Sequence, residues 1–453
     1  MNRSTPTHPS LSRLPILAYA TGSIGAGLYS TVPGILLLYY MTQSLGLPVS
    51  MASLVVLVPK LAVVFIDPLI GTVSDGMTSR WGRRRPFLLS GALLSGLTFV
   101  LLFSLPALGS HVATALLMGV AYFATSISFS IFAVPYVAMP AELAPDSKTQ
   151  SALIGTRMFF MFAGVLLAAV FAPVLVDTFG GGSRAYSRMA LILAGLSTTS
   201  MLISATLSPA SPDPVHRRPL EARDIVRIFA HIPFSLSLLT YAVAITATAV
   251  TSAAVPYFMV FSLARPESDI AIVFLSQILI CLALMPVWSL VAPRIGPART
   301  LAIACLISAC CSLAFRLLTP ESSLATIAVT GAINGVGLAG VQVAAFALLA
   351  QLTNHLNHRM EGRFEGIITG LWTATEKLAL AVGPTICAVT LSLGGFVGKT
   401  GRELLPDTAI QATMEAMSSV PAVIALVAAG LIFLYRVMLT DGVACETTSI
   451  HTR

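Results

Sequence analysis

Long apolar runs, separated by short polar segments, dominate the sequence. Six runs centre near Gly27, Val63, Leu97, Phe123, Leu166 and Leu196, and six more near Ala247, Leu282, Ile307, Gly337, Leu380 and Ala425. About 20 apolar residues let a helix cross the hydrocarbon core of a bilayer. The runs also lack the single apolar stripe of a helix on a soluble core. The pattern therefore predicts an all-α, polytopic membrane protein with twelve transmembrane helices.

One polar stretch inside the chain is longer than the rest, and it separates the two sets of runs. It is rich in proline and arginine, a composition typical of a linker. We therefore predict an N-terminal six-helix half over residues 1–208, a cytoplasmic linker over 209–232, a C-terminal six-helix half over 233–440 and a cytoplasmic tail over 441–453.

Composition agrees with a membrane location. The chain is 56% hydrophobic and only 10% charged, whereas soluble proteins carry roughly 25% charged residues. With both termini inside the cell, the outer segments hold only six of the 26 Lys and Arg residues, which are Arg184, Arg188, Arg265, Arg316, Lys399 and Arg402. This bias follows the positive-inside rule and predicts a bacterial inner (plasma) membrane protein with two cytoplasmic termini.

Several function classes lack their signals. The six cysteines form no C-x-x-C pair and read as small hydrophobes, and His355-x-x-His358 alone is a weak metal signal. No G-x-x-x-x-G-K-[ST] occurs, so ATP is not the expected energy source. We predict no enzyme activity, no resident cofactor or metal, and no nucleic-acid partner.

A polar motif joins the second and third predicted spans. Gly71-x-x-x-Asp75 ends one helix, and Arg83, Arg84 and Arg85 open the next. An acid at a helix end can pair with an arginine and hold two helices together until a conformational switch breaks the pair. We predict that these five residues form a gating latch; the alternative is that the arginines only keep the loop inside the cell.

The motif from Ser74 to Phe87 resembles that of the major facilitator superfamily, and within it the glycoside–pentoside–hexuronide:cation symporters of the melibiose and sucrose carrier type. Val134-Pro135-Tyr136, Gly362-Arg363-Phe364 and Gly394-Gly395-Phe396 extend the resemblance over most of the chain. The resemblance implies two six-helix halves in a major facilitator fold, around a central substrate path. It also implies cation-coupled transport of a sugar or a related small organic solute.

Asp67 is the candidate for cation coupling. It lies inside a predicted span and precedes Pro68, which leaves the carbonyl of Val64 without its helical donor. The alternative is a structural carboxylate neutralised by Lys60, nearly two turns earlier. The melibiose carrier pattern has a second acid where this chain has Val63, and sugar-binding acids where it has Gly27 and Ala133. Fewer hard oxygen ligands favour H⁺ over Na⁺ as the coupling ion.

Two basic residues within predicted spans match basic residues of the family. Lys377 matches a lysine that couples the cation and substrate sites there, and Arg157 is a candidate for substrate binding. Their alternatives are a salt bridge for Lys377 and snorkelling to the interface for Arg157. With Lys60, Asp67 and Glu376, the embedded charges are three positive and two negative, which favours an anionic solute such as a carboxylated sugar.

Aromatic and amide side chains could complete a substrate pocket, because rings suit sugar faces and amides suit hydroxyls. The candidates are Tyr29, Tyr136, Trp372 and Gln342, with Tyr122, Tyr257 and Gln277 as further possibilities. Ordinary interhelical packing is the alternative for each.

We therefore expect a symporter that acts as a monomer. Its expected partners are a small solute and the membrane lipid. A proton-driven exporter of a metabolite or antibiotic on the same fold is the main alternative. A non-transporting membrane scaffold or sensor is a minor one, since a scaffold has little reason to keep charges inside its spans.

Overall fold

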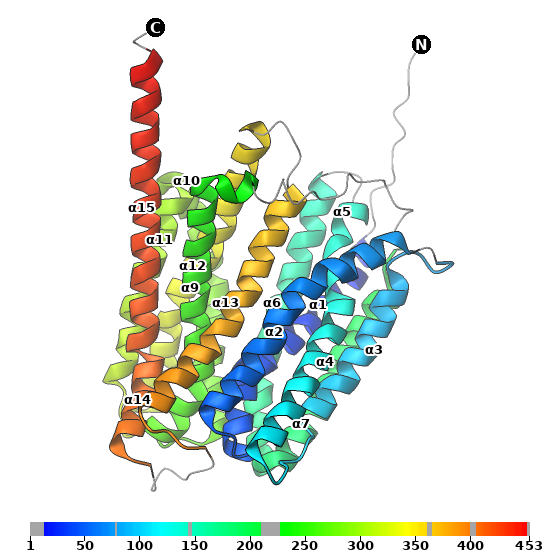
Figure 1. The fold of residues 1–453 in the computed structure, drawn as a ribbon, viewed down its shortest axis with the longest axis vertical. Helices are drawn as coiled ribbons and strands as arrows, with labels where there is room; N and C mark the ends of the chain where they lie inside the picture. The colour runs from blue at the N-terminus through cyan, green and yellow to red at the C-terminus, as the bar shows by residue number, and fades with distance from the viewer. Residues whose placement is uncertain are drawn as a thin grey trace. The chain divides into compact units, whose positions relative to one another are not determined.

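The computed structural model describes residues 13–77, 79–143, 147–209, 227–359, 365–398 and 405–450. Most of the predicted linker, Arg363 and the first twelve residues lie outside these ranges. Within them the chain is helical and contains no strand, which confirms the predicted all-α class (Figure 1).

Contacts between residues group the chain into two units. Unit 1 comprises Met1–Pro33, Ser44–Leu47 and Val58–His216, and unit 2 comprises Gly34–Gln43, Pro48–Leu57 and Arg217–Arg453. The division between His216 and Arg217 falls in the predicted linker. The segment after the first helix, Gly34–Gln43, and the start of the second helix are grouped with unit 2, so the second helix contributes residues to both units.

The first half of the chain contains α1 (Arg13–Val32), α2 (Val49–Gly76), α3 (Arg85–Leu102), α4 (His111–Ala138), α5 (Pro140–Leu143), α6 (Ser147–Thr178) and α7 (Gly182–Leu207). Two π-helical turns, Pro33–Leu37 and Tyr40–Ser44, follow α1. In α2, Pro59 and Pro68 are accommodated within a continuous helix.

The second half contains α9 (Ile232–Tyr257), α10 (Ile270–Ile295), α11 (Pro297–Ala314), α12 (Leu324–Arg359), α13 (Glu365–Leu393), α14 (Asp407–Met417) and α15 (Ser419–Ile450). A π-helical turn, Phe258–Ser262, extends α9, and short 3₁₀ turns at Glu267–Asp269 and Phe315–Leu317 precede α10 and follow α11.

By length and composition, eleven helical segments of the described residues could cross a membrane. They run from α2 to the joined segment Asp407–Leu434 of α14 and α15. The twelfth predicted span corresponds to α1, whose glycines, serines and threonines leave it below the hydropathy that the eleven segments reach.

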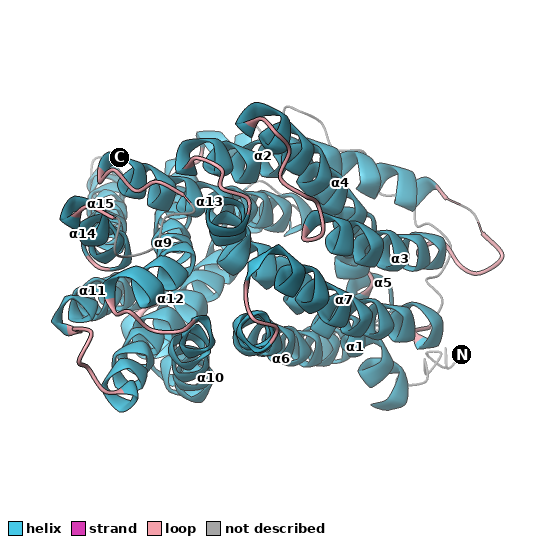
Figure 2. Cartoon of the chain, turned by 90° about the horizontal axis from the view of Figure 1, so that it is seen from below, coloured by secondary structure: helices cyan, strands magenta, loops and turns pink. Residues whose placement is uncertain are grey.

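Helix packing repeats between the two units. In unit 1 the first long helix, α1, packs on α6 and α7, and α3 packs on α4 and α7. In unit 2 the first long helix, α9, packs on α13 and α15, and α11 packs on α12 and α15. Figure 2 shows these neighbours end-on. Counted along each unit, α6 and α13 are both the fifth long helix, so they occupy corresponding places.

Glycines allow the first and fifth long helices to approach closely. A Cβ on Gly27 of α1 would lie 2.5 Å from the carbonyl oxygen of Met161 in α6. A Cβ on Gly383 of α13 would lie 2.8 Å from the amide nitrogen of Val250 in α9. Real Cβ atoms do not come this close to backbone atoms, so the sequence favours helix contact here by omitting a side chain.

Candidate functional site

Two of the three charged residues of α2, Lys60 and Asp67, lie on one face of the helix. The ammonium of Lys60 lies 5.7 Å from the ring centroid of Tyr122 in α4, a distance suited to a cation–π contact. The carboxylate of Asp67 attracts the same ammonium electrostatically. Both side chains are only partly exposed. Lys60 thus points toward α4, and Asp67 is close enough to Lys60 for the two opposite charges to offset each other within the span.

The predicted gating latch is an ion pair within the loop from α2 to α3. The guanidinium of Arg84 lies 2.5 Å from the carboxylate of Asp75 and donates a 2.8 Å hydrogen bond to Ser74. Arg83 donates to the carbonyl of Asp75 at 3.4 Å. Arg84 is buried whereas Asp75 is exposed, so the pair is screened by solvent on one side.

The third arginine ties this loop to another helix. Arg85 donates to the carbonyls of Thr206 and Ser208, at 3.1 and 2.9 Å, at the end of α7. Gly71 faces α4, where an added Cβ would meet Val134 at an ordinary 3.6 Å. The arrangement can fasten α2, α3 and α7 at one end of unit 1; its role in gating stays a prediction.

An aromatic pair forms a closed hydrogen-bond network in unit 1. The rings of Tyr19 in α1 and Tyr136 in α4 stack with centroids 4.7 Å apart. Each hydroxyl donates to the carbonyl of the other residue, at 3.0 Å from Tyr19 and 2.7 Å from Tyr136. Ser23 lies 2.7 Å from the Tyr136 hydroxyl, and Ser204 donates to the Tyr19 carbonyl at 2.9 Å.

Arg157 of α6 lies beside this network. Its guanidinium is close enough to the Tyr19 hydroxyl to interact with it, and it also contacts the sulfur of Met158 at 3.7 Å. The side chain is partly exposed. Arg157 therefore joins a buried tyrosine network to an accessible charge, an arrangement that can respond to an anionic ligand.

Tyr29 has a separate environment in the same unit. Its ring stacks on Phe129 with centroids 4.4 Å apart, and its hydroxyl donates to the carbonyl of Thr125. Tyr29 and Tyr136 are both buried. Contact between either ring and a solute would require a change in this packing, so their assignment to substrate binding stays a prediction.

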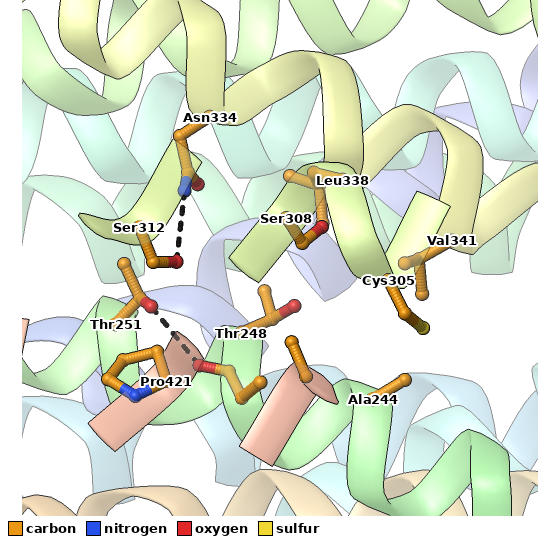
Figure 3. A pocket seen from close by; sticks show the side chains of 12 residues that line it. Ala244, Thr248, Thr251, Cys305, Ser308, Ser312, Asn334, Leu338, Val341 and Pro421 are labelled. Atoms are coloured by element: carbon orange, nitrogen blue, oxygen red, sulfur yellow. Dashed lines mark hydrogen bonds between the residues drawn. The ribbon is translucent and has the colours of Figure 1, made fainter. Parts of the chain in front are cut away.

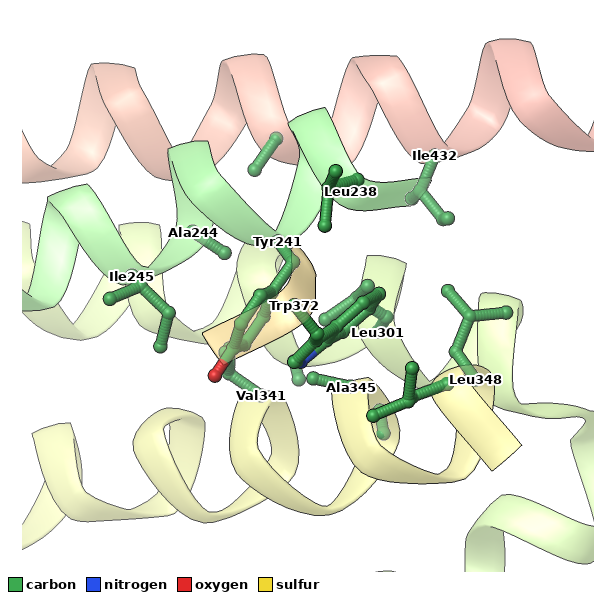
Figure 4. Packing of buried hydrophobic residues seen from close by; sticks show 14 of the residues in the cluster. Leu238, Tyr241, Ala244, Ile245, Leu301, Val341, Ala345, Leu348, Trp372 and Ile432 are labelled. Carbon is green, nitrogen blue, oxygen red and sulfur yellow. The ribbon is translucent and has the colours of Figure 1, made fainter. Parts of the chain in front are cut away.

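Unit 2 also contains a stacked aromatic pair, Tyr241 of α9 and Trp372 of α13. The rings stack with centroids 4.4 Å apart and an interplanar angle of 18°. Both side chains are fully buried in an apolar cluster that includes Leu301, Leu348 and Ile432 (Figure 4). The Tyr241 hydroxyl and the Trp372 Nε1 have no hydrogen-bond partner among the described residues.

Three other polar side chains to consider in unit 2 lie on α12 and α13. Glu376 and Lys377 are consecutive residues of α13, both partly exposed, and they attract each other electrostatically. Gln342 of α12 is partly exposed, and its buried Oε1 has no partner in the described part of the chain. Lys377 and Trp372 thus lie on the same helix, with Glu376 between them.

A small polar cavity also lies within unit 2 (Figure 3). Its volume is about 20 Å³, and its wall includes Thr248, Ser308, Ser312 and Asn334. Asn334 donates to Ser312 at 3.5 Å and accepts from Gln277 at 2.6 Å. A cavity of this size holds about one water molecule, so it is too small for a solute.

Sequence reasoning missed several members of these clusters. Tyr19 and Ser23 are four residues apart and share a face of α1, which a search for hydroxyls at helical spacing could have found. Tyr241 gives no such signal in the sequence. What singles it out is its contact with Trp372 and Glu376 of α13, more than a hundred residues later in the chain. Among the described residues, no group of three or more His, Cys, Asp or Glu could hold a metal ion.

The chain is similar in sequence to known membrane transporters. A family profile described as "MFS/sugar transport protein" matches residues 18–438. The chain is 25% identical over 395 residues to "Uncharacterized symporter YnaJ" of Bacillus subtilis, covering 85% of this chain and 84% of the relative. It is 22% identical to the "Glucuronide carrier protein homolog" of Escherichia coli, covering 85% of both. It is 21% identical to the "Isoprimeverose transporter" of Lactiplantibacillus pentosus, covering 87% and 83%.

Solved structures share the fold at lower identity. The nucleoside transporter NupG superimposes with a TM-score of 0.65 at 13% identity, covering 94% of this chain and 99% of NupG. A bacterial homologue of the human lysosomal transporter Spinster gives a TM-score of 0.70 at 13% identity, covering 95% and 97%. At this identity the likeness is one of fold alone.

Proposed function

This chain belongs to the MFS/sugar transport protein family, and we propose that it is a proton-coupled symporter of a sugar or a related small, anionic organic solute. It is a multi-pass membrane transporter, and the predicted resemblance to glycoside–pentoside–hexuronide:cation symporters is confirmed by the family and by its relatives. The ion, the solute, the direction and the inner-membrane location with cytoplasmic termini are the proposed part.

The observation that carries the proposal is the charged face of α2. Asp67 and Lys60 lie within one membrane-spanning helix, where the two charges attract each other and the Lys60 ammonium lies over the Tyr122 ring of α4. A charge at the bilayer centre costs about 2.5–3.5 kcal/mol on insertion scales, so charges are kept there for a function or for each other. A single carboxylate paired with a lysine offers few oxygen ligands to Na⁺, but it can accept a proton.

The nature of the solute is inferred from relatives and from charge. Relatives that align over most of this chain are named for a glucuronide and for isoprimeverose. Arg157 and Lys377 add positive charge within the spans, and an arginine is well suited to bind a carboxylate. We therefore favour a carboxylated sugar over a neutral disaccharide.

The test is uptake into cells or proteoliposomes that contain the full chain. A labelled glucuronide is offered with an imposed pH gradient or an imposed Na⁺ gradient, and a neutral disaccharide is the competitor. We expect accumulation driven by the pH gradient, weak competition by the disaccharide, and loss of accumulation in Asp67→Asn with some exchange retained. Asp67→Glu is the matched control and should keep part of the coupling.

Three outcomes would contradict the proposal. Unchanged active uptake by Asp67→Asn would remove Asp67 from coupling, and equal competition by the disaccharide would remove the preference for anions. Proton-driven efflux without accumulation would support the exporter on the same fold instead.

A further inference from the structure

Each unit places a tyrosine of its first long helix close to a charged side chain of its fifth. In unit 1, Tyr19 of α1 lies beside Arg157 of α6. In unit 2, Tyr241 of α9 lies beside Glu376 of α13. The two pairs of helices occupy corresponding places, and each pair brings together a tyrosine and a charged side chain. The charged side chain is positive in unit 1 and negative in unit 2. Unit 2 therefore has a carboxyl where unit 1 has a guanidinium.

The position of Glu376 follows from helix geometry. Residues four apart on a helix share a face, and Glu376 is four residues after Trp372. The Trp372 ring stacks on Tyr241, so this face of α13 is turned toward α9. The carboxyl of Glu376 is thereby brought near the Tyr241 hydroxyl, one turn beyond the stacked rings.

This site contains two buried donors that lack an acceptor. Tyr241 and Trp372 are both fully buried, and neither the Tyr241 hydroxyl nor the Trp372 Nε1 meets a partner with hydrogen-bond geometry in the described chain. A buried donor without an acceptor is costly, especially within a membrane. An ionised carboxylate is the strongest acceptor that a side chain can offer, and Glu376 is the carboxylate within reach.

Glu376 has an environment that suits two protonation states. When ionised, it can accept a hydrogen bond from Tyr241 and is attracted by Lys377 of its own helix. When protonated, it carries no charge within the span, which lowers the cost of its partial burial. Tyr241 of α9 and Lys377 of α13 are the titratable groups that act on it. Neither state leaves a buried charge without compensation.

We propose that Glu376 is a second proton-binding residue of this transporter, with Tyr241 as a positioning residue. Its carboxylate accepts one proton from water and later returns it, while Tyr241 keeps its own proton and orients the carboxylate by donating to it. Participation in coupled transport rests on the proposed function. Proton binding itself does not, and it can be measured without a substrate.

Trp372 provides the reporter for this test. The chain has three tryptophans, so the double variant Trp81→Phe, Trp288→Phe leaves Trp372 as the only one. Its fluorescence is followed in detergent while pH is varied across the range in which carboxyl and imidazole groups titrate. We expect one sigmoidal change in emission, because the charge of Glu376 changes one turn from the indole.

Variants on the same background assign the titrating group. The pH-dependent change in Trp372 emission should be absent in Glu376→Gln. In Glu376→Asp it should be present, with its midpoint at a different pH. Tyr241→Phe should move the midpoint without abolishing the change, as expected of a positioning residue. Asp67→Asn is the matched control in unit 1 and should leave the change intact. Circular dichroism confirms that each variant keeps its helical content.

The results separate this inference from the proposed function. A flat titration in a folded single-tryptophan protein, or a change that survives in Glu376→Gln, would overturn the inference even if uptake proved to be proton-driven. If Asp67→Asn keeps full active uptake while the change still depends on Glu376, the Asp67 coupling assignment fails and the inference stands. In transport, Glu376→Gln should lose pH-driven accumulation and keep exchange.

Discussion

Each unit stacks a tyrosine of its first long helix on an aromatic ring of another helix, and the polar atoms of the two stacks are satisfied differently. In unit 1, Tyr19 and Tyr136 stack and exchange hydrogen bonds between each hydroxyl and the other's carbonyl. In unit 2, Tyr241 and Trp372 stack at a similar separation, yet neither polar atom has a partner in the described chain. Both units thus bury a ring stack on their first long helix, but only in unit 1 do the polar atoms of the stacked side chains all have hydrogen-bond partners among the described residues.

This difference separates a structural role from a chemical one. A closed network holds its helices in one arrangement, because any movement breaks several bonds at once. Unused donors beside a titratable carboxyl do the opposite, since they favour whichever arrangement supplies an acceptor. We infer that α1 and α4 form a rigid part of unit 1, whereas the region around Tyr241 can change its bonding with protonation.

The largest expected effect tests a feature that both units share, the close glycine contact between the first and fifth long helices. Gly27→Ala in unit 1 and Gly383→Ala in unit 2 each place a Cβ against the backbone of the neighbouring helix. Overpacking of this kind costs about 1–3 kcal/mol, so both variants should lower the thermal unfolding temperature in detergent. Gly27→Asp adds the cost of a charge within the span, about 2.5–3.5 kcal/mol on insertion scales, and should be less stable still.

The controls for this prediction are glycines with open space around them. An added Cβ on Gly195 of α7 or Gly370 of α13 meets nothing within 4 Å. Alanine there should be neutral or stabilising by about 0.5–1 kcal/mol, because it restricts the unfolded chain. If all four alanine variants unfolded at the same temperature, close approach at Gly27 and Gly383 would not distinguish these helix contacts.

A smaller effect should distinguish the two aromatic pairs. Tyr136→Phe removes the hydroxyl that donates to the Tyr19 carbonyl and contacts Ser23, and the loss of partner for the buried Ser23 hydroxyl should cost about 1–3 kcal/mol. Tyr241→Phe removes a hydroxyl that lies beside Glu376 but makes no hydrogen bond of standard geometry in the described chain, so its effect on stability should stay within about 0.5 kcal/mol. Thermal unfolding of the two variants side by side measures the difference, and equal losses would contradict the comparison.

The sequence predicted the fold well, because the membrane makes the fold depend on local composition. Apolar runs of sufficient length identify helices whatever they pack against, and the predicted centres near Val63, Phe123 and Leu380 fall within α2, α4 and α13. The first span falls below the hydropathy of the eleven other segments, and its Gly22, Gly25 and Gly27 lie against other helices.

The candidate site was less accessible to sequence reasoning. Charges within spans, such as Asp67 and Lys377, stand out against their apolar neighbours. The residues that these charges contact do not stand out. A stack such as Tyr241 on Trp372 joins residues far apart in the chain, and a tyrosine in a membrane helix is not unusual by itself. Sequence alone is also limited at Gly27. Its alignment with an acid of the family indicates that this chain lacks the acid, but only the structure shows that a side chain would collide with α6 there.

The smallest expected effect compares two tryptophans of unit 2. Trp288 of α10 donates a 3.1 Å hydrogen bond from Nε1 to the carbonyl of Val336, whereas Nε1 of Trp372 has no partner in the described chain. Phenylalanine removes similar ring volume at both sites, so the difference between Trp288→Phe and Trp372→Phe reports mainly on the N–H group. Trp288→Phe should be less stable by about 1 kcal/mol, measured by thermal unfolding in detergent. A reversed order would mean that Trp372 Nε1 finds an acceptor in the folded protein, and Glu376 would then be the first side chain to test.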